Sequence, residues 1–171
     1  AVGSTESSIY LNFFNITAGK FDELYLPGVS FVNNTSAQLT FDVAYRQYQA
    51  ENDKLEVMVS TDCGATWSTV YNKQGATLST AAASTTNFAP TAAQWRAETV
   101  SLSSYVGQSI IMKFKGTSNY GNNLWIDNIN VSGTTGINQI VNNNSVKVYP
   151  SVVSDKVTIS TSFTENQNLT I

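Results

Sequence analysis

Apolar and polar residues alternate in short segments along most of this chain. In residues 54–60 (KLEVMVS), Leu55, Val57 and Val59 fall on one face and Glu56 on the other, which is the period of a half-buried β-strand. No long window keeps the 3.6-residue apolar period of an α-helix. The alternation predicts strands in residues 8–14, 37–48, 54–60, 68–73, 95–102, 109–117 and 124–132.

Turn-forming residues separate these segments. The pairs PG at 27–28, NN at 33–34 and GN at 121–122 favour tight turns. Residues 81–94 contain alanines that a helix tolerates, but their Thr, Asn and Pro residues favour a long loop. Many short strands with regular turn signals are typical of a sandwich or a barrel. We therefore predict an all-β fold, specifically a two-sheet antiparallel jelly-roll sandwich.

A change of pattern near residue 133 divides the chain. Residues 133–145 (GTTGINQIVNNNS) are polar, rich in Gly and Asn and without period, and are expected to form a linker. The predicted sandwich then spans 1–132, and 146–171 forms a short, partial β unit that is too small to bury a core of its own. LTI at 169–171 resembles the start of another strand, so we expect this second unit to be truncated.

Composition and charge narrow the functional class. With 171 residues, 42% hydrophobic and 12% charged, the chain can bury one sizeable core. Its net charge of -3 leaves no basic patch for phosphates, which argues against nucleic acid as a partner. No apolar run is long enough for a transmembrane segment. The sequence does not begin with a signal peptide, so any such peptide is expected to have been removed or to lie outside it.

The residue types needed for several kinds of catalysis are missing. The sequence contains no histidine, which excludes Ser-His-Asp and Cys-His constellations and His-ligated zinc. Cys63 is the only cysteine, so no disulfide can form within the chain. We expect Cys63 to be a small, partly buried thiol. Carboxylates remain as the candidates for chemistry.

Residues 60–67 (STDCGATW) fit the pattern S-x-D-x-G-x-T-W, the Asp box of sialidase propeller blades. Each residue has a structural task available: Asp62 can accept hydrogen bonds from the turn, and Gly64 can adopt a positive φ. Thr66 can bond back to the turn, and Trp67 can lie beneath it. A sialidase needs several blades and a cluster of arginines, whereas this chain has one box and two arginines. We interpret the motif as a hairpin turn.

A second carboxylate pattern provides the alternative function. Glu51, Asp53 and Glu56 fit E-x-D-x-x-E, which resembles the catalytic strand of laminarinase-type glycoside hydrolases, a jelly-roll family with a nucleophile and an acid/base flanking the scissile bond. The intervening residues in that family are apolar and buried. Here they include Asn52 and Lys54, which are typical of a solvated hairpin end, so the hydrolase is the less favoured hypothesis.

Residues Leu24 to Val131 resemble a MAM-like, concanavalin-type jelly-roll module of secreted Bacteroidetes proteins, related to the cleaved-adhesin domains of gingipains. The resemblance is carried by LTFDVAY (39–45), DKLEVMVSTDCGATWSTVY (53–71), QWRAETVSLSSYVGQS (94–109) and YGNNLWIDNINV (120–131). It implies a noncatalytic accessory module that binds glycans or proteins, or packs beside a catalytic domain of a larger protein. Relatives begin with an extra strand, so we expect the start of the chain to be truncated or processed.

The segment KVYPSVVSDKVTIS (147–160) resembles the opening of the C-terminal sorting domain of the type IX secretion system, which usually reads V-Y-P-N-P. Ser151 and Val152 replace the Asn-Pro pair, and the chain ends before the Gly-containing and basic finish of that family. The resemblance implies export by the type IX secretion machinery, followed by secretion or attachment to the outer-membrane surface. Residues 146–171 are expected to be an incomplete sorting domain.

The same resemblance implies structural calcium near the meeting point of the first and last strands. By position, Asp127 in LWIDNINV matches the acidic residue of the last strand, and Asp22 is a possible second ligand. Calcium takes about six to eight oxygen ligands, which suits carboxylates. The alternative is that Asp127 and Asn128 only order their strand.

Aromatic and amide residues near the predicted loops are the candidates for ligand binding. Aromatic faces can stack on sugar rings, and asparagine amides can hydrogen-bond sugar hydroxyls. The alternative is that the tryptophan belongs to the core and the tyrosines are ordinary strand-end residues. The candidates are Tyr48, Tyr105, Tyr120, Asn122, Asn123 and Trp125. We therefore predict a noncatalytic, secreted or cell-surface module for adhesion, with a glycan or a surface protein as its ligand.

Overall fold

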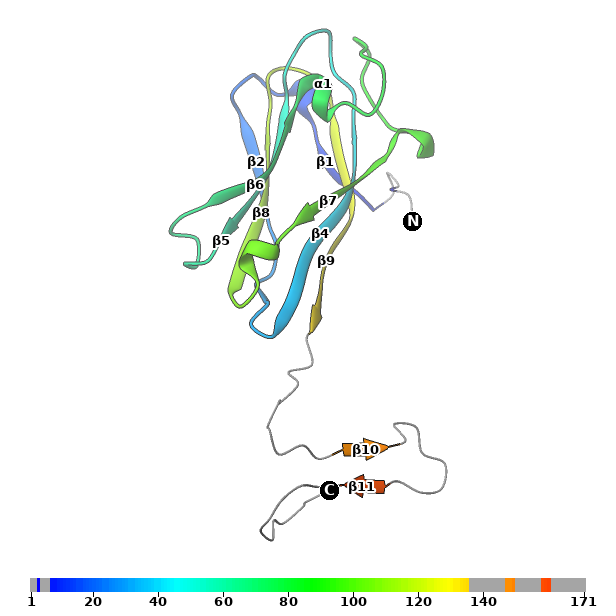
Figure 1. The fold of residues 1–171 in the computed structure, drawn as a ribbon. Coiled ribbons are helices and arrows are strands. Elements are labelled where there is room, and N and C mark those ends of the chain that lie inside the picture. The colour runs from blue at the N-terminus through cyan, green and yellow to red at the C-terminus, as the bar shows by residue number, and fades with distance from the viewer. Residues whose placement is uncertain (1–2, 4–6, 136–146, 150–157, 161–171) are drawn as a thin grey trace. The chain divides into compact units, whose positions relative to one another are not determined.

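The computed structural model describes residues 3, 7–135, 147–149 and 158–160 (Figure 1). The chain divides into two compact units, Ala1–Gly136 and Ile137–Ile171. In the second unit, β10 (Lys147–Tyr149) and β11 (Thr158–Ser160) form an antiparallel pair. Within the described ranges, no helix is long and apolar enough to cross a membrane.

The first unit is built from two antiparallel sheets (Figure 1). The four-stranded sheet has the order β1 (Ile9–Leu11), β9 (Leu124–Thr135), β4 (Asn34–Tyr45) and β7 (Arg96–Ser101). The five-stranded sheet has the order β2 (Phe21–Tyr25), β8 (Ser109–Thr117), β5 (Lys54–Ser60) and β6 (Ser68–Gln74), with β3 (Val29–Ser30) also on β8. Short helical turns connect the strands, namely η1 (Phe13–Asn15), α1 (Gly75–Leu78), η2 (Ala92–Gln94) and η3 (Ser103–Tyr105).

The strand pairing is nested along the sequence. β1 pairs with β9, β2 with β8, β4 with β7 and β5 with β6, each pair antiparallel and each enclosed by the one before it. The pairs β4–β9 and β5–β8 then complete the two sheets. A long hairpin rolled into two sheets has this order, which is the jelly-roll topology. The predicted all-β, two-sheet antiparallel sandwich is therefore confirmed.

Most of the predicted strands are present, with differences at their ends. β5 and β8 coincide with the predicted segments 54–60 and 109–117. The segment 8–14 is strand only as far as Leu11, because Phe13–Asn15 turns into a 3-10 helix. β2 was not predicted because Asp22 and Glu23 are adjacent acidic residues, so the segment lacks a regular alternation of apolar and polar residues.

β9 continues into the range that was predicted to be linker. It ends at Thr135 rather than at residue 132, and Gly133 lies opposite Ala37 of β4. The side chains of Thr134 and Ser36 hydrogen-bond at 2.7 Å. The sequence of this stretch is polar and lacks an apolar period, so only its pairing with β4 identifies it as a strand.

The apolar faces of the two sheets meet in one core. Leu39, Phe41 and Val43 alternate along β4 and are all buried, as the period of two requires. The ring of Phe41 contacts those of Phe114 in β8 and Tyr71 in β6 edge-to-face, with centroids 5.0 Å and 5.3 Å apart. These contacts between sheets fix which face of β4 points outward.

A charge network closes the side of the sandwich where β6 and β7 meet. Lys73 Nζ donates to both oxygens of Glu98 at 2.7 and 2.8 Å, and Arg96 Nε donates to Glu98 Oε1 at 2.8 Å. Arg96 also donates to the carbonyl of Leu78 at the end of α1, at 3.0 Å. Burial alone would raise the pKa of Glu98, but the hydrogen bonds from Lys73 and Arg96 outweigh it and hold the pKa below its ordinary value.

The Asp-box turn between β5 and β6 is held by its own side chains. Ser60 Oγ accepts from the Gly64 N–H at 2.8 Å and donates to Asp62 Oδ1 at 2.6 Å. Asp62 accepts from the N–H and the hydroxyl of Thr66 at 2.9 and 2.5 Å. Trp67 Nε1 donates to the Gly64 carbonyl at 3.1 Å. The predicted structural tasks of Asp62, Gly64, Thr66 and Trp67 are confirmed, and Ser60 adds one that the motif did not reveal.

Cys63 differs from the expectation of a partly buried thiol. It is exposed at the tip of the Asp-box turn. Cys63 and Gly64 have φ values of 58° and 92°, so the chain turns sharply there. The physical reason is that two successive residues with positive φ direct the tip away from the sheet.

Asp62 makes the turn sensitive to acid. The hydrogen bonds from Ser60 and Thr66 lower its pKa from 3.8 to about 2. A carboxylate with a lowered folded-state pKa stabilises the fold above its unfolded pKa, and this stabilisation is lost as the pH falls through the folded pKa. The difference in unfolding free energy between wild type and Asp62→Ala should therefore be constant above about pH 5 and decrease progressively as the pH falls to about 2 and below.

Urea denaturation across a pH series measures this difference, with Asp22→Ala, an exposed aspartate outside the turn, as the control for general effects of acid. A wild type–Asp62→Ala difference that stays unchanged down to pH 2 would show that the carboxylate does not hold the turn.

Candidate functional site

The aromatic residues predicted to bind a ligand do not gather at one place. Tyr105 lies in η3, which precedes β8, whereas Tyr120 follows β8. They therefore lie at opposite ends of a nine-residue strand. Tyr48 is half-buried in the loop after β4, and its ring contacts Phe14 edge-on at 6.1 Å. Tyr120 is the most exposed of the candidates, with 59% of its surface accessible.

Trp125 is half-buried on the outer face of β9. Its ring stacks against Tyr10 of β1, with centroids 4.4 Å apart. Its Nε1 donates to the Phe88 carbonyl at 3.2 Å. This contact joins the outer face of the four-stranded sheet to the loop 81–94.

Asn122 and Asn123 occupy structural positions, in contrast to the expectation that their amides face a ligand. Both are buried, with 0% and 1% exposure. Asn122 accepts from the Phe88 N–H at 3.0 Å and donates to the Thr86 carbonyl at 2.9 Å. Asn123 donates to the Phe88 carbonyl at 3.2 Å and accepts from the Phe14 N–H at 3.3 Å. The loop folds over both amides and uses their hydrogen-bonding capacity, so sugar hydroxyls cannot reach them.

Asp53, the central carboxylate of the hydrolase alternative, is fully buried. It accepts from the backbone N–H groups of Asn119, Gly121 and Asn122 at 2.6, 3.1 and 2.7 Å, and from the Tyr45 hydroxyl at 3.0 Å. This carboxylate therefore anchors the loop between β8 and β9. The sequence suggested a solvated hairpin end, but the three donors of that loop enclose Asp53.

The other two carboxylates of the E-x-D-x-x-E pattern, Glu56 and Glu51, lie in different surroundings. Glu56 pairs with Lys54 at 2.9 Å on the solvent face of β5, because Leu55 and Val57 point into the core. Glu51 is half-buried before the strand begins. Because Asp53 is fully buried and accepts four hydrogen bonds, it is not accessible as an acid or a base.

The two predicted calcium ligands belong to different sheets. Asp22 lies in β2 opposite Gly116, and Asp127 lies in β9 opposite Asp42. Among the residues that the structure describes, no group of three or more His, Cys, Asp or Glu side chains could hold a metal ion. Asp22 and Asp127 therefore do not belong to a carboxylate cluster of this kind in the described part of the chain.

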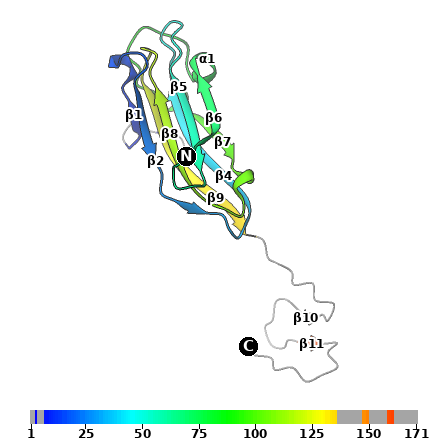
Figure 2. The same ribbon diagram turned by 90° about the vertical axis from the view of Figure 1, so that its left-hand side faces the viewer.

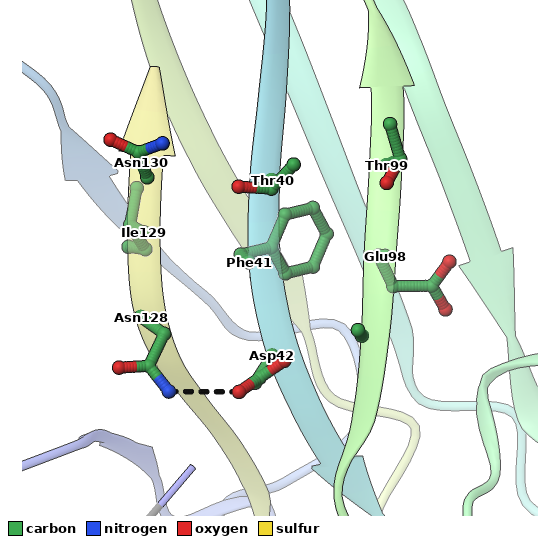
Figure 3. Close-up of a pocket in the computed structure, with 9 residues that line it drawn as sticks. Thr40, Phe41, Asp42, Glu98, Thr99, Asn128, Ile129 and Asn130 are labelled. Carbon is green, nitrogen blue, oxygen red and sulfur yellow. Dashed lines mark hydrogen bonds between the residues drawn. The ribbon is translucent and has the colours of Figure 1, made fainter. Parts of the chain in front are cut away.

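A groove of about 450 Å³ opens on the outer face of the four-stranded sheet (Figure 3). We call it the outer-face groove. It crosses β9, β4 and β7 and carries hydroxyl, amide and carboxylate groups. Its lining consists of Thr40, Phe41, Asp42, Ala97, Glu98, Thr99, Asn128, Ile129 and Asn130.

Strand register creates a polar row across this groove. Thr40 in β4 lies opposite Thr99 in β7 on one side and opposite Asn130 in β9 on the other. All three point outward because Leu39 and Phe41 on either side of Thr40 point into the core. The sequence contains these residues at alternate positions of three strands, but only the pairing brings them together.

A β-bulge shapes one end of the groove. The register of β4 and β9 shifts between Thr40 and Asp42, and Asn128 has a φ of 50°. Asn128 Nδ2 donates to Asp42 Oδ2 at 2.8 Å (Figure 3), and the Asn128 N–H donates to Asp127 Oδ1 at 2.7 Å. A bulge bends its strand and redirects side chains, which accounts for a hollow at this point of the sheet.

The charge of the groove is negative. Asp42 lies on the groove side of β4, where it is 6% exposed and accepts a hydrogen bond from Asn128. The lining includes neither lysine nor arginine. Glu98 also borders the groove, but its side chain points the other way, into the network with Lys73 and Arg96. Repulsion from Asp42 disfavours an anionic ligand here, whereas the hydroxyl and amide groups suit a neutral one.

The Trp125–Tyr10 pair lies on the same face as the groove. Trp125 pairs with Ala44, and Asp127 with Asp42, so the tryptophan is one alternate position beyond the groove along β9. Tyr10 lies opposite Trp125 in β1 and is 43% exposed. Of the predicted ligand residues, Trp125 is therefore the one whose face of the sheet also carries the groove.

The fold is similar to solved adhesin domains. No protein-family model and no curated protein sequence matches the chain. The K1 cleaved adhesin domain of Lys-gingipain from Porphyromonas gingivalis W83 is 14% identical, with 74% of each chain covered and a TM-score of 0.50. The K3 cleaved adhesin domain of the same protein is 17% identical, with 74% of this chain and 71% of that chain covered and a TM-score of 0.47. The K1 likeness supports the sandwich fold.

Replacing Asp53 tests its role as an anchor. Asp53→Ala leaves three backbone N–H groups and the Tyr45 hydroxyl without their acceptor, so we expect a loss of about 3 kcal/mol or more in unfolding free energy. Glu56→Gln, which breaks only a partly exposed ion pair, should cost about 1 kcal/mol or less. Urea denaturation measures both. Equal stability of Asp53→Ala and Glu56→Gln would contradict the structural role of Asp53.

Proposed function

We propose that the sandwich is a noncatalytic binding module that holds a neutral glycan in the outer-face groove. The observation that carries this proposal is the row Asn130–Thr40–Thr99 beside Asp42 in one groove. These groups lie on three paired strands, so their positions are fixed before a ligand binds.

The chemistry of the groove matches that of sugar hydroxyls. Threonine hydroxyls both donate and accept, and the Asn130 amide offers both functions side by side. The Asp42 carboxylate, 6% exposed, contributes negative charge beside them. The Trp125–Tyr10 pair adds an aromatic surface on the same face, which suits the apolar face of a sugar ring. The carboxylate and the absence of basic side chains in the lining favour neutral sugars over acidic ones.

The burial of Asp53 favours a binding module over the glycoside hydrolase alternative. A hydrolase needs two carboxylates facing the substrate, whereas Asp53 is enclosed by the β8–β9 loop and Glu56 is paired with Lys54. The K1 domain of similar fold is described as a cleaved adhesin domain, which is compatible with an adhesion role. A surface protein as the ligand is the second candidate, because the groove lies on a broad, open sheet face.

The proposal places the module on the bacterial surface or in the medium, after export by the type IX secretion machinery. The support comes from the resemblance of residues 147–160 to the start of a sorting domain. Within that range the structure describes β10 and β11 as an antiparallel pair. Ser151 and Val152, which replace the usual Asn-Pro pair, lie outside the described residues.

Groove variants test glycan binding. The chain should bind neutral glycans on an array in preference to sialylated or sulfated ones. Asn130→Ala or Thr99→Val should each weaken binding by about tenfold, since each removes a hydrogen bond to the ligand. Isothermal titration with the best array glycan measures the loss.

Thr69→Val is the matched control, because Thr69 is an exposed threonine on β6 in the other sheet. Binding that survives the groove variants would place the glycan elsewhere. An array without any binding would contradict the glycan proposal and favour a protein ligand.

A fusion experiment tests the export signal. A reporter followed by residues 133–171 should be retained in the periplasm of a bacterium with a type IX system if the sorting domain is incomplete. Export to the surface or the medium that disappears in a strain lacking the secretion channel would show that this segment is sufficient. Fractionation with immunodetection of the reporter distinguishes the two outcomes.

A further inference from the structure

We propose that the free edge of β2 is a docking site for an extended peptide strand of a partner protein. The strand would extend the five-stranded sheet and insert alternate apolar side chains between the two sheets. This interaction is independent of the outer-face groove, which lies on the other sheet.

The first observation is the open edge itself. β2 pairs with β8 through all five of its residues, and among the described strands none pairs with its other edge. An edge strand presents unpaired N–H and C=O groups in the spacing that another strand requires. Peptides that bind by strand addition use these groups for affinity and alternate side-chain pockets for specificity.

The second observation is a cleft beside that edge. β1 and β2 are the edge strands of the two sheets and lie at the same side of the sandwich (Figure 2). A cleft of about 240 Å³ opens between them. Its apolar lining includes Ile9, Leu11, Leu24, Phe114 and Ile126. Inward-facing side chains of a strand added to β2 would enter this cleft.

At the opposite side of the sandwich, a salt bridge connects the edge strands of the two sheets. There, Lys73 of β6 reaches Glu98 of β7 at 2.7 Å and joins the two sheets. On the β1–β2 side, none of the salt bridges among the described residues joins the two sheets. The sandwich is therefore bridged on one side and open on the other.

The solvent face of β2 offers contacts for the remaining side chains of an added strand. Phe21 and Tyr25 are 55% and 56% exposed and flank Glu23 on this face. Lys115 Nζ lies 4.3 Å from the Phe21 ring centre, and Lys113 Nζ lies 5.4 Å from that of Tyr25. Aromatic side chains held in place in this way lose little freedom on binding, which suits them as anchors.

The charge at the β2 edge indicates which kind of peptide would bind there. Glu23 is neutralised by Lys113 at 2.9 Å, but Asp22 lines the mouth of the cleft and takes part in none of the described salt bridges. A strand with alternate apolar residues and a basic residue opposite Asp22 complements this edge. A second copy of the chain is disfavoured because it would bring a second Asp22 to the same edge, and like charges at neighbouring strand positions are destabilising.

Selection from a library of random peptides tests the proposal. The full chain should enrich peptides with alternate apolar residues and at least one basic residue. Asp22→Lys should weaken the selected peptides by about tenfold through charge reversal. The double variant Phe21→Ala, Tyr25→Ala should weaken them by a similar factor through loss of the aromatic anchors. Glu51→Lys, which reverses a charge away from β2, is the matched control.

Backbone methylation separates strand addition from other modes of binding. In a strand, alternate N–H groups point to opposite edges, so N-methylation of one alternate set should abolish binding and methylation of the other set should leave it intact. Failure to enrich any peptide, equal binding to the β2 variants, or equal effects of both methylation sets would overturn the proposal. Sedimentation showing a dimer that Asp22→Asn strengthens would identify a second copy as the occupant instead. The β2 variants should leave glycan binding unchanged, so the two proposals can fail separately.

Discussion

The pairing of β4 with β9 is the constraint on which the rest of the sandwich depends. These are the central strands of the four-stranded sheet, and their register runs from Asn34 opposite Thr135 to Tyr45 opposite Leu124. It turns the apolar residues of both strands towards the second sheet and leaves their polar residues outside. The bulge near Asn128 is one of two shifts in this register, and it lies at the groove beside Thr40 and Asn130.

Buried polar side chains fix the loops at one end of the sandwich. Asp53 collects three backbone donors of the loop between β8 and β9, and Asn122 and Asn123 of that loop then hold the segment around Phe88. A buried polar group without a partner is costly, so each of these residues stabilises only the arrangement that satisfies it. Residue types that look functional in the sequence therefore maintain loop structure here.

The outer faces of the two sheets differ in chemistry. The four-stranded face carries threonine, asparagine and the carboxylate of Asp42. The five-stranded face carries aromatic rings in contact with lysines: Lys113 Nζ lies 4.3 Å from the Trp67 ring centre, and Lys115 contacts Phe21 in the same way. The proposed glycan and the proposed peptide strand thus have separate surfaces on one small module.

By itself, the sequence determined the fold class, most strand positions and the Asp-box turn, because alternation and turn chemistry are local properties of neighbouring residues. It also indicated Trp125 as a candidate ligand residue, but it did not indicate the row of polar residues on the neighbouring part of the same sheet face. Thr40, Thr99 and Asn130 lie far apart in the chain, and the burial of Asp53 depends on donors from residues 119–122. Register between distant strands and enclosure by distant loops decide which polar groups are accessible, and only the tertiary structure provides both.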